Sequence, residues 1–262
     1  MCDVCGCGEP QHRHRHGDHV HMHPHAPGEP HYNRDESSGL RSVRVEADVM
    51  AKNDRNAALN RDWFEGRNIV ALNLVSSAGA GKTTLLERTL HDLAGECPWA
   101  VVEGDQQTDN DARRIAACGV PVVQINTGAL CHLDAQMVLD ACRRLNSPAG
   151  TVILIENVGN LICPALFDLG ESAKVVVASV TEGDDKPEKY PYMFRAASLI
   201  ILNKCDLLPY VPFDAQRFER IAHQVNPDAP VLRVSVTRGD NLAAWYDWLR
   251  ERRALNATAG EA

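Results

Sequence analysis

The stretch SSAGAGKTTLL, residues 76 to 86, has the composition of a loop that holds phosphate groups. Its small residues let successive backbone N–H groups converge on phosphate oxygens, and the dipole of a following helix adds to the attraction. Lys82 is predicted to reach the β- and γ-phosphates, and the Thr83 hydroxyl is predicted to bind Mg²⁺. The other loop residues expected to bind nucleotide are Gly79, Gly81 and Thr84.

This loop departs from the pattern G-x-x-x-x-G-K-[ST] at one position, where Ser76 replaces the first glycine. A serine is compatible with such a loop if its local φ is negative, since only a positive φ favours glycine. A glycine turn that happens to precede Lys-Thr is the alternative, and the flanking strand-like and helix-like stretches favour the phosphate loop.

A second motif, NKCDLL at residues 203 to 208, matches the N-K-x-D element with which G proteins read guanine. The Asp206 carboxylate can accept hydrogen bonds from guanine N1–H and the 2-amino group, whereas adenine has an acceptor at N1 and no 2-amino group. Adenine would leave the buried charge of Asp206 unpaired, so such a site can favour GTP over ATP by roughly 10⁴-fold. Asn203, Lys204 and Asp206 therefore predict GTP and GDP as ligands, and Ser235 begins a segment expected to support the base.

Two carboxylates end apolar runs between these motifs. Glu156, in TVILIENVGNL, stands where an ordinary G protein carries Asp-x-x-Gly, and it is predicted to hold Mg²⁺ through water because glutamate reaches further. Asp105, in VVEGDQQTDNDARRI, ends another run at the same expected edge, and a role as a turn or helix-capping residue is equally open. Lys82, Thr83, Asp105 and Glu156 form the predicted catalytic set, and Arg113 and Arg114 are expected on the surface.

The first residues of the chain, MCDVCGC, place Cys2, Cys5 and Cys7 close enough to bind one metal ion. The three thiolates and the α-amino group of the chain can form a near-planar array. Such an array suits Ni²⁺, which tolerates square-planar geometry, whereas Zn²⁺ prefers a tetrahedron. The cysteines therefore favour nickel over zinc. An iron–sulfur ligand set or a redox-active cysteine cluster remains an alternative.

The histidines that follow are close together in a segment with few apolar residues. Many overlapping pairs can chelate there, which gives capacity and fast exchange in place of one rigid site. Imidazole binds metal only when neutral, so occupancy should fall towards pH 5.5. The predicted storage ligands are His12, His14, His16, His19, His21, His23, His25 and His31.

A third possible metal site lies in the second half of the chain. Cys131 and His132 are adjacent in NTGALCHLDAQMV, and Cys163 follows Glu156 by seven residues in NLICP. If both loops lie at the same edge of the sheet, two thiolates and an imidazole can meet, and this set suits zinc or nickel better than magnesium. Buried cysteine as a small apolar residue is the competing interpretation.

Alternating short apolar runs and helix-length stretches surround these motifs. The pattern predicts a doubly wound, mostly parallel α/β sheet, in which a P-loop GTPase domain spans residues 36–262. Residues 1–35 are predicted to be a disordered Cys/His-rich metal-binding tail. Expected strands are 69–75, 100–103, 122–125, 152–156, 174–179, 199–202 and 231–234, and expected helices are 47–63, 83–93, 109–118, 133–145, 214–225 and 242–255.

Composition excludes several classes of function. The net charge of −8 and the absence of a basic stripe argue against nucleic-acid binding. No run approaches the roughly 20 apolar residues that span a bilayer, and no hydrophobic signal region is present, so neither a membrane partner nor export is expected. The protein is expected to be cytoplasmic, with its nine cysteines reduced.

Six blocks in order give the chain, from about residue 40 onward, a resemblance to the hydrogenase nickel-incorporation GTPases of the HypB family: SSAGAGKTTLL, EGDQQTDNDARRI, GALCHLDAQM, ENVGNLICP, TEGDDKPEKYPYMF and NKCDLL. The N-terminal CDVCGCG resembles that family's high-affinity nickel motif, and the histidine tract resembles the storage tail of some members. The resemblance implies a GTP-dependent homodimer, with Cys131, His132 and Cys163 at the interface. It also implies delivery of Ni²⁺ to the [NiFe]-hydrogenase large subunit with a nickel-accessory protein.

Other functions remain open at this stage. One alternative is a nickel or zinc storage protein with a slow regulatory G domain, and another is an accessory GTPase for a different nickel enzyme such as urease. The urease accessory GTPases carry Cys-Pro-His, whereas this chain has Cys131-His132 without the proline, plus Cys163, which favours the hydrogenase branch. A general G protein of translation or signalling is disfavoured because it needs no metal ligands.

Overall fold

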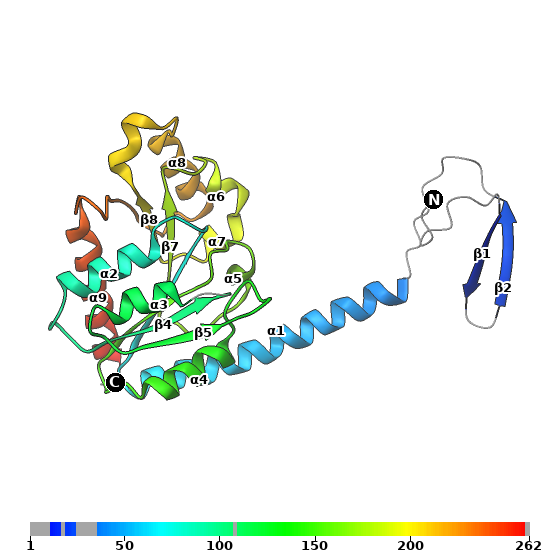
Figure 1. Ribbon diagram of the computed structural model, residues 1–262, viewed down its shortest axis with the longest axis horizontal. Coiled ribbons are helices and arrows are strands. Elements are labelled where there is room, and N and C mark those ends of the chain that lie inside the picture. The colour runs from blue at the N-terminus through cyan, green and yellow to red at the C-terminus, as the bar shows by residue number, and fades with distance from the viewer. Residues whose placement is uncertain (1–10, 17–18, 25–35, 107–108, 260–262) are drawn as a thin grey trace. The chain divides into compact units, whose positions relative to one another are not determined.

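The computed structural model describes residues 11–16, 19–24, 36–106 and 109–259 (Figure 1). The chain divides into two compact units, Met1–Glu46 and Ala47–Ala262. The second unit contains a seven-stranded sheet in the order β5-β4-β6-β3-β7-β8-β9, in which every neighbouring pair is parallel. Its strands are β3 (Val70–Ser76), β4 (Trp99–Asp105), β5 (Val122–Asn126), β6 (Val152–Glu156), β7 (Ala173–Ser179), β8 (Leu199–Asn203) and β9 (Val231–Arg233).

Helices cover both faces of this sheet, so the predicted doubly wound α/β fold is confirmed. The helices are α1 (Glu36–Glu65), α2 (Lys82–Asp92), α3 (Asn110–Ala116), α4 (Ala135–Leu145), α5 (Cys163–Leu166), α6 (Lys186–Lys189), α7 (Pro191–Arg195), α8 (Ala215–Val225) and α9 (Leu242–Ala259), with a 3₁₀ helix η1 (Cys205–Tyr210).

The central strands are buried on both faces because helices lie on each side. In β3, Leu72 and Leu74 pack beneath α2 and α9, while Ala71 and Val75 contribute to the clusters beneath the opposite helices. Such strands read as continuous apolar runs, which is typical of parallel sheets. This explains why the sequence shows the strands clearly without an alternating pattern.

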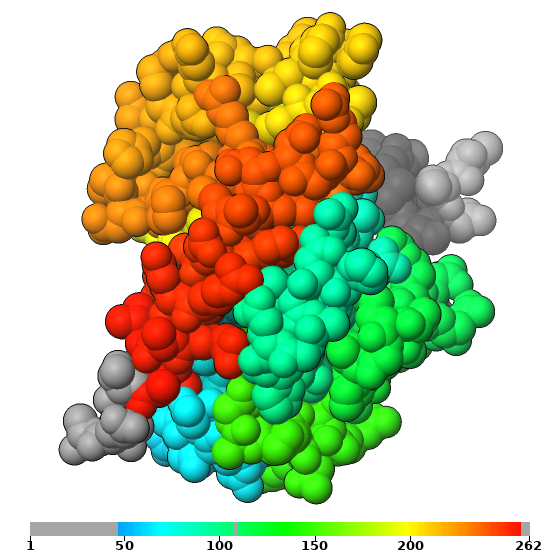
Figure 2. Space-filling view, turned by 90° about the vertical axis from the view of Figure 1, so that its left-hand side faces the viewer, coloured from blue at the N-terminus to red at the C-terminus, as the bar shows by residue number. Residues whose placement is uncertain are grey.

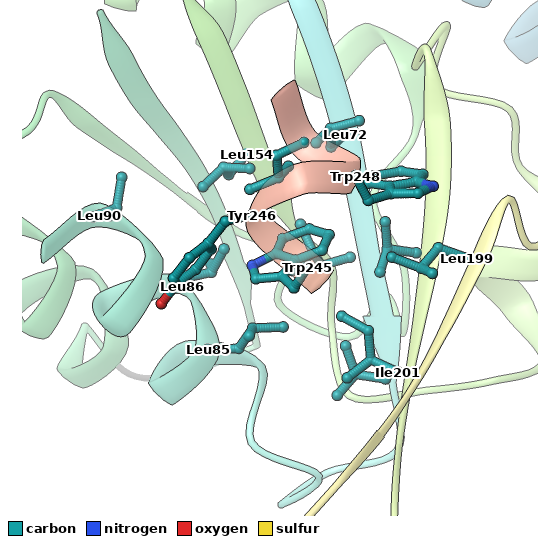
Figure 3. Packing of buried hydrophobic residues seen from close by; sticks show 14 of the residues in the cluster. Leu72, Leu85, Leu86, Leu90, Leu154, Leu199, Ile201, Trp245, Tyr246 and Trp248 are labelled. Carbon is teal, nitrogen blue, oxygen red and sulfur yellow. The ribbon is translucent and has the colours of Figure 1, made fainter. Parts of the chain in front are cut away.

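The C-terminal helix α9 closes one face of the sheet. Trp245 is fully buried among residues of α2, β3 and β8, and its indole N–H donates to Thr89 Oγ1 at 2.8 Å (Figure 3). The Tyr246 hydroxyl donates to Asp92 Oδ2 at 2.8 Å. Figure 2 shows α9 in red beside α2 in turquoise. Burial of large aromatic side chains stabilises by about 2 kcal/mol each, and it holds α2 against the sheet.

Part of the segment expected to be a disordered tail forms an antiparallel ribbon. β1 (Gln11–His16) pairs with β2 (His19–Pro24), and the register aligns His12 with His23, His14 with His21 and His16 with His19. The alternation of histidine with other residues has the period of a strand, so histidines face histidines across the pair. From the sequence, the closely spaced histidines predicted many metal ligands but no strand pairing.

Many element boundaries differ from the predicted ones, and two of these differences concern helices next to the metal-ligand loops. The expected helix 47–63 lies within a longer α1, and the expected helix 133–145 begins two residues later at Ala135. Asp134 caps α4, because its side chain accepts a hydrogen bond from Met137 N at 2.8 Å. In the part of the chain that the structure describes, no helix is long and apolar enough to cross a membrane.

Two asparagines fix the C-terminal half of α1 to the sheet domain. Asn60 is fully buried, and its Nδ2 donates to Ala135 O and Leu169 O, both at 2.8 Å. Asn53 Oδ1 accepts from Ala135 N, and Asn53 Nδ2 donates to Asp168 O. Buried amides in these positions satisfy backbone groups that would otherwise have no partner. The helix therefore joins the start of α4 to the loop before β7.

Replacing Asn60 with alanine should lower the free energy of unfolding by about 1–3 kcal/mol, because two buried carbonyls lose their donor. Urea denaturation followed by circular dichroism measures this change. Leu59→Ala is the matched control, since Leu59 is the neighbouring helical residue and 56% exposed. Equal stability of the two variants would show that the asparagine does not anchor the helix.

Candidate functional site

The carboxyl ends of β3, β4 and β6 surround a cavity of about 420 Å³. Parallel strands that end together create such a crevice, and here the strand order places β3, which leads into the phosphate loop, next to the adjacent carboxylate-bearing strands β6 and β4. Most predicted nucleotide-binding residues line it together with groups that the sequence interpretation left out. The polar and glycine residues of its wall include Gly79, Gly81, Lys82, Thr83, Thr84, Glu103, Asp105, Asp111, Arg114, Glu156, Asn157, Gly159 and Lys204.

Lys82 lies almost completely buried at the start of α2, where its Nζ donates to Ser76 Oγ at 2.8 Å. Burial lowers the pKa of this lysine, and the Glu156 carboxylate acts in the opposite direction. Ser76 ends β3 without a positive φ, so the serine fits where the pattern asks for glycine. Positive φ values occur instead at Gly79 and Gly81, with φ of 76° and 101°. The departure at position 76 is therefore compatible with a phosphate loop.

Glu156 contacts the first residue after Lys82. The Thr83 hydroxyl donates to Glu156 Oε1 at 2.7 Å, while Glu156 Oε2 is buried and has no hydrogen-bond partner among the described residues. Burial raises the pKa of Glu156, and Lys82 and the Thr83 hydroxyl oppose the shift. An orphaned carboxylate oxygen beside a threonine hydroxyl suits a hard cation such as Mg²⁺, whose ligands are oxygens.

Glu103 is a second buried carboxyl that the sequence interpretation missed. It lies beside Glu156 in the register of β4 and β6, is 2% exposed, and its Oε2 also lacks a partner in the described part of the chain. Burial and the Glu156 carboxylate raise the pKa of Glu103 to about 8. A charged residue inside the apolar run before Asp105 was the signal that could have identified it.

Asp105 lies at the cavity and also makes a turn contact, so its position is compatible with both interpretations of the sequence. It ends β4 and lines the cavity, and its Oδ1 accepts from the backbone N of Gln106 at 2.6 Å, as in a turn. Arg114 was expected on the surface, and its side chain is 44% exposed. It nevertheless lines the cavity, where it pairs with Glu87 and Asp111.

The predicted base-reading residues lie behind the phosphate loop. Asn203 Nδ2 donates to Ala80 O at 3.0 Å, and Lys204 Nζ donates to Gly79 O at 2.8 Å. A Cβ on Gly81 would lie 2.6 Å from Asn203 Nδ2, so glycine is required there on steric grounds as well as by its φ. Asn203 and Lys204 thus hold the phosphate loop against the end of β8.

Asp206 follows them in η1, and its carboxylate is oriented by Ser235. The Ser235 hydroxyl donates to Asp206 Oδ1 at 2.6 Å, and the backbone N of Arg238 donates to Ser235 Oγ at 3.3 Å. The sequence predicted that this segment supports the base, and in the structure the serine side chain contacts the Asp206 carboxylate. One Asp206 oxygen is thereby fixed by a neutral donor.

A separate cluster of soft ligands lies at the same end of the sheet. The ligand atoms of Cys131, His132 and Cys163 all lie within 4.8 Å of one another, and the two thiols are 2.8 Å apart, with Cys131 Sγ donating to Cys163 Sγ. The predicted meeting of two loops is therefore present in the geometry. Burial lowers the pKa of His132, which favours the neutral imidazole that binds metal.

Packing around the cluster fixes the ligands. The ring of His132 stacks on Phe167 with centroids 3.9 Å apart. Lys174, which is buried in β7, donates to Pro164 O at 3.1 Å and holds the start of α5. The pKa of the Cys163 thiol is raised by its hydrogen bond with Cys131 and by burial. Two thiols and an imidazole match the donor set of zinc and nickel sites.

The structure describes only some of the predicted N-terminal metal ligands. Cys2, Cys5, Cys7, His25 and His31 lie outside the described residues. The remaining predicted storage ligands lie on β1 and β2, at the register positions given above. The six cysteines of the second unit are all free thiols, in agreement with reduced cysteines.

Comparison with known proteins identifies close relatives. Residues 70–233 match the model of the CobW/HypB/UreG nucleotide-binding domain. The chain is 54% identical to the hydrogenase maturation factor HypB of Azotobacter vinelandii over 222 residues, which are 85% of this chain and 73% of that protein. It is 52% identical to HypB of Escherichia coli K12 over 233 residues, 86% of this chain and 80% of that protein.

Solved structures agree with this similarity. HypB from Archaeoglobus fulgidus has a TM-score of 0.73 and 39% identity, over 78% of this chain and 99% of that one. HypB from Helicobacter pylori in complex with nickel has a TM-score of 0.73 and 37% identity, over 78% of this chain and 96% of that one.

The raised pKa of Glu103 predicts a pH-dependent loss of stability. The unfolded carboxyl ionises near its ordinary pKa of 4.5, whereas the folded one keeps its proton until about pH 8. The unfolded state therefore binds fewer protons between these values, and stability falls as pH rises through that window. Glu103→Gln should remove this contribution and raise the free energy of unfolding at pH 8 by on the order of 2 kcal/mol, with little effect at pH 4.5.

Urea denaturation of nucleotide-free protein with a chelator, at both pH values, tests this expectation. Glu251→Gln is the control, because Glu251 is exposed on α9. A Glu103→Gln profile parallel to that of the parent protein would show that the carboxyl is not protonated in the folded state.

Proposed function

The chain belongs to the HypB family of hydrogenase maturation factors, and we propose that it hydrolyses GTP and delivers Ni²⁺ for assembly of the [NiFe]-hydrogenase active site. One observation carries the proposal: a phosphate-sized cavity and a Cys/His/Cys cluster lie at the same end of one sheet, joined by the segment 156–163. A GTP-binding protein without metal cargo has no need of this cluster.

In the proposed nucleotide site, GTP takes its phosphates into the cavity and its base beside Asp206. Gly79, Gly81 and Thr84 surround the phosphates, Lys82 exchanges Ser76 Oγ for phosphate oxygens, and Asn203 and Lys204 support the loop. Thr83, Glu156 and Asp105 are the proposed ligands, direct or through water, of a Mg²⁺ ion that neutralises charge on the β- and γ-phosphates. The partnerless oxygens of Glu103 and Glu156 support a cation there.

In the proposed metal site, Ni²⁺ is cargo held by Cys131, His132 and Cys163, and Zn²⁺ is a competing occupant. The ligand atoms already lie close together, so binding needs little rearrangement of the chain. The nickel complex of the Helicobacter pylori relative supports nickel as a ligand of the family. Cys2, Cys5 and Cys7 are proposed to form a second, tighter nickel site.

A homodimer that forms on GTP or metal binding is proposed around this cluster. Three large apolar residues next to the ligands are exposed, Leu130 at 44%, Ile162 at 62% and Leu166 at 56%. Exposed apolar groups around a functional site are typical of interaction surfaces. The proposed further partners are a hydrogenase nickel-accessory protein and the [NiFe]-hydrogenase large subunit.

Metal storage is a second candidate function, favoured by the register of the N-terminal ribbon. Three of its six cross-strand pairs join histidine to histidine. The backbone register sets histidine opposite histidine in these pairs, and histidine is a common ligand of zinc and nickel. The storage histidines would then supply metal that the GTPase domain releases.

Asp206→Asn should weaken GTP binding by about 100-fold or more and should admit xanthosine triphosphate. The variant amide can donate to the carbonyl that xanthine carries where guanine has its 2-amino group. Isothermal titration with both nucleotides measures the switch. Asp228→Asn, an exposed change on the surface, is the control. Unchanged GTP affinity in Asp206→Asn would contradict the proposed mode of base recognition.

Cys163→Ala should lower the Ni²⁺ affinity of the GTPase-domain site by more than about tenfold, because one of two thiolates is lost. The test uses the full chain with Cys2, Cys5 and Cys7 replaced by serine, so that thiolate-to-nickel charge-transfer absorption reports the remaining site. Cys118→Ala, which removes another half-buried thiol, is the matched control.

In the otherwise unaltered chain, Cys163→Ala should also restore less [NiFe]-hydrogenase activity than Cys118→Ala in cells that lack their own maturation factor and grow with little nickel. Equal restoration by both variants would exclude the Cys131/His132/Cys163 site from nickel delivery.

A further inference from the structure

The segment 156–163 borders the nucleotide cavity and also contains one of the residues of the Cys131/His132/Cys163 cluster. It begins at Glu156, which accepts the Thr83 hydrogen bond, and it ends at Cys163. Between them, Gly159 lines the cavity and lies so close to the phosphate loop that an added Cβ would be 3.0 Å from Ala78 Cα. A displacement of the phosphate loop towards Gly159 would therefore displace the backbone of this segment as well.

Two asparagines of this segment bind the other loop that carries metal ligands. Asn157 Oδ1 accepts from Leu133 N at 3.2 Å, and Asn160 Nδ2 donates to Cys131 O at 3.3 Å. One of these hydrogen bonds is made by the carbonyl of Cys131 and the other by the N–H of Leu133, so the two bonds flank His132. The position of both ligands is thus tied to the segment that borders the nucleotide cavity.

Asn157 is held too firmly to move independently of its backbone. It is 1% exposed, its Nδ2 donates to Asn73 Oδ1 at 3.2 Å, and its backbone N donates to Leu74 O at 3.0 Å. Asn160 is half-buried, and its Oδ1 accepts from Ile162 N at 2.9 Å within a turn. The first asparagine therefore follows the end of β6, and the second follows the turn that leads to Cys163.

The ligand-bearing loop also meets the strand that carries Asp105. Thr127 N donates to Asp105 O at 2.9 Å, and Gln106 Nε2 donates to Leu130 O at 3.3 Å. The loop is consequently bonded to the ends of both carboxylate-bearing strands, β4 and β6. These hydrogen bonds are sufficient to connect the Cys131/His132/Cys163 site with the nucleotide cavity.

Metal entry needs a change in the distance between the two cysteine sulfurs. The thiols of Cys131 and Cys163 are 2.8 Å apart. A metal that holds two thiolates in a tetrahedron at about 2.3 Å places the sulfurs about 3.8 Å apart. The two sulfurs must therefore separate by about 1 Å, and the bonds from Asn157 and Asn160 join the two loops that carry them.

We infer that Asn157 and Asn160 are positioning residues that couple the nucleotide state to the metal affinity of the Cys131/His132/Cys163 site. The inference rests on the proposed function, because it assumes that GTP and nickel are the two ligands. Neither asparagine needs to touch the metal: each transmits a displacement of the segment 156–163 to the loop of Cys131 and His132. Their loss should reduce the difference in metal affinity between the GTP and GDP states.

The test measures the Ni²⁺ dissociation constant with a non-hydrolysable GTP analogue and with GDP, in the full chain with Cys2, Cys5 and Cys7 replaced by serine. The parent should show a ratio of about tenfold or more between the two states. Asn160→Ser and Asn157→Ala should bring the ratio close to one. Serine keeps an acceptor for Ile162 N and is too short to reach Cys131 O.

Asn126→Ser is the matched control, because Asn126 Oδ1 accepts from Gly128 N in a similar turn without a bond to the segment 156–163. It should retain the parent ratio. A purely structural role of the asparagines would weaken metal binding equally in both nucleotide states and leave the ratio unchanged. Asn160→Ser provides the test even if Asn157→Ala does not fold.

The outcomes separate the two proposals. A parent ratio of tenfold that persists in Asn160→Ser and Asn157→Ala overturns the inference alone, and the proposed switch stands. A parent ratio of one overturns the inference together with nucleotide-controlled release. Failure of the parent to bind GTP or nickel at all overturns the proposed function itself.

Discussion

The parallel register of β3, β6 and β4 is the constraint on which the rest of the structure depends. It places Glu156 and Glu103 side by side and brings Lys82 to the same end of the sheet. Three ionisable groups buried so close together are costly unless partners compensate them. The partnerless carboxylate oxygens show that protein groups alone do not complete this compensation in the described residues, which leaves room for a cation and phosphates.

The same register explains why two sites share one short segment. β6 lies directly beside β3, which leads into the phosphate loop, so the chain that leaves Glu156 passes close to that loop before it turns towards Cys163. Asn157 and Asn160 satisfy backbone groups on the neighbouring loop through one buried and one partly buried hydrogen bond. Buried hydrogen bonds of this kind resist independent motion, so displacement at one site is passed to the other.

Much of this architecture could be predicted from local patterns. Apolar β-branched runs identified the seven strands of the sheet, and the small residues before Lys82, together with NKCDLL, identified the nucleotide site. Other parts could not be predicted because their signals are not local. Glu103 resembles any charged residue near a strand end until its register with Glu156 is known. Likewise, Ser235 reaches Asp206 only because β9 pairs with β8.

The sequence by itself determined which chemical groups the chain carries: a glycine-containing loop before Lys82, the carboxylate of an N-K-x-D motif, and two thiols and an imidazole, since side-chain types fix what each group can bind. Only the tertiary structure decided that Cys131, His132 and Cys163 meet within 4.8 Å. It also decided that Glu103 joins the cavity and that two asparagines connect the sites. The physical reason is that ligand identity is a property of single residues, whereas distance and burial arise from strand order and packing.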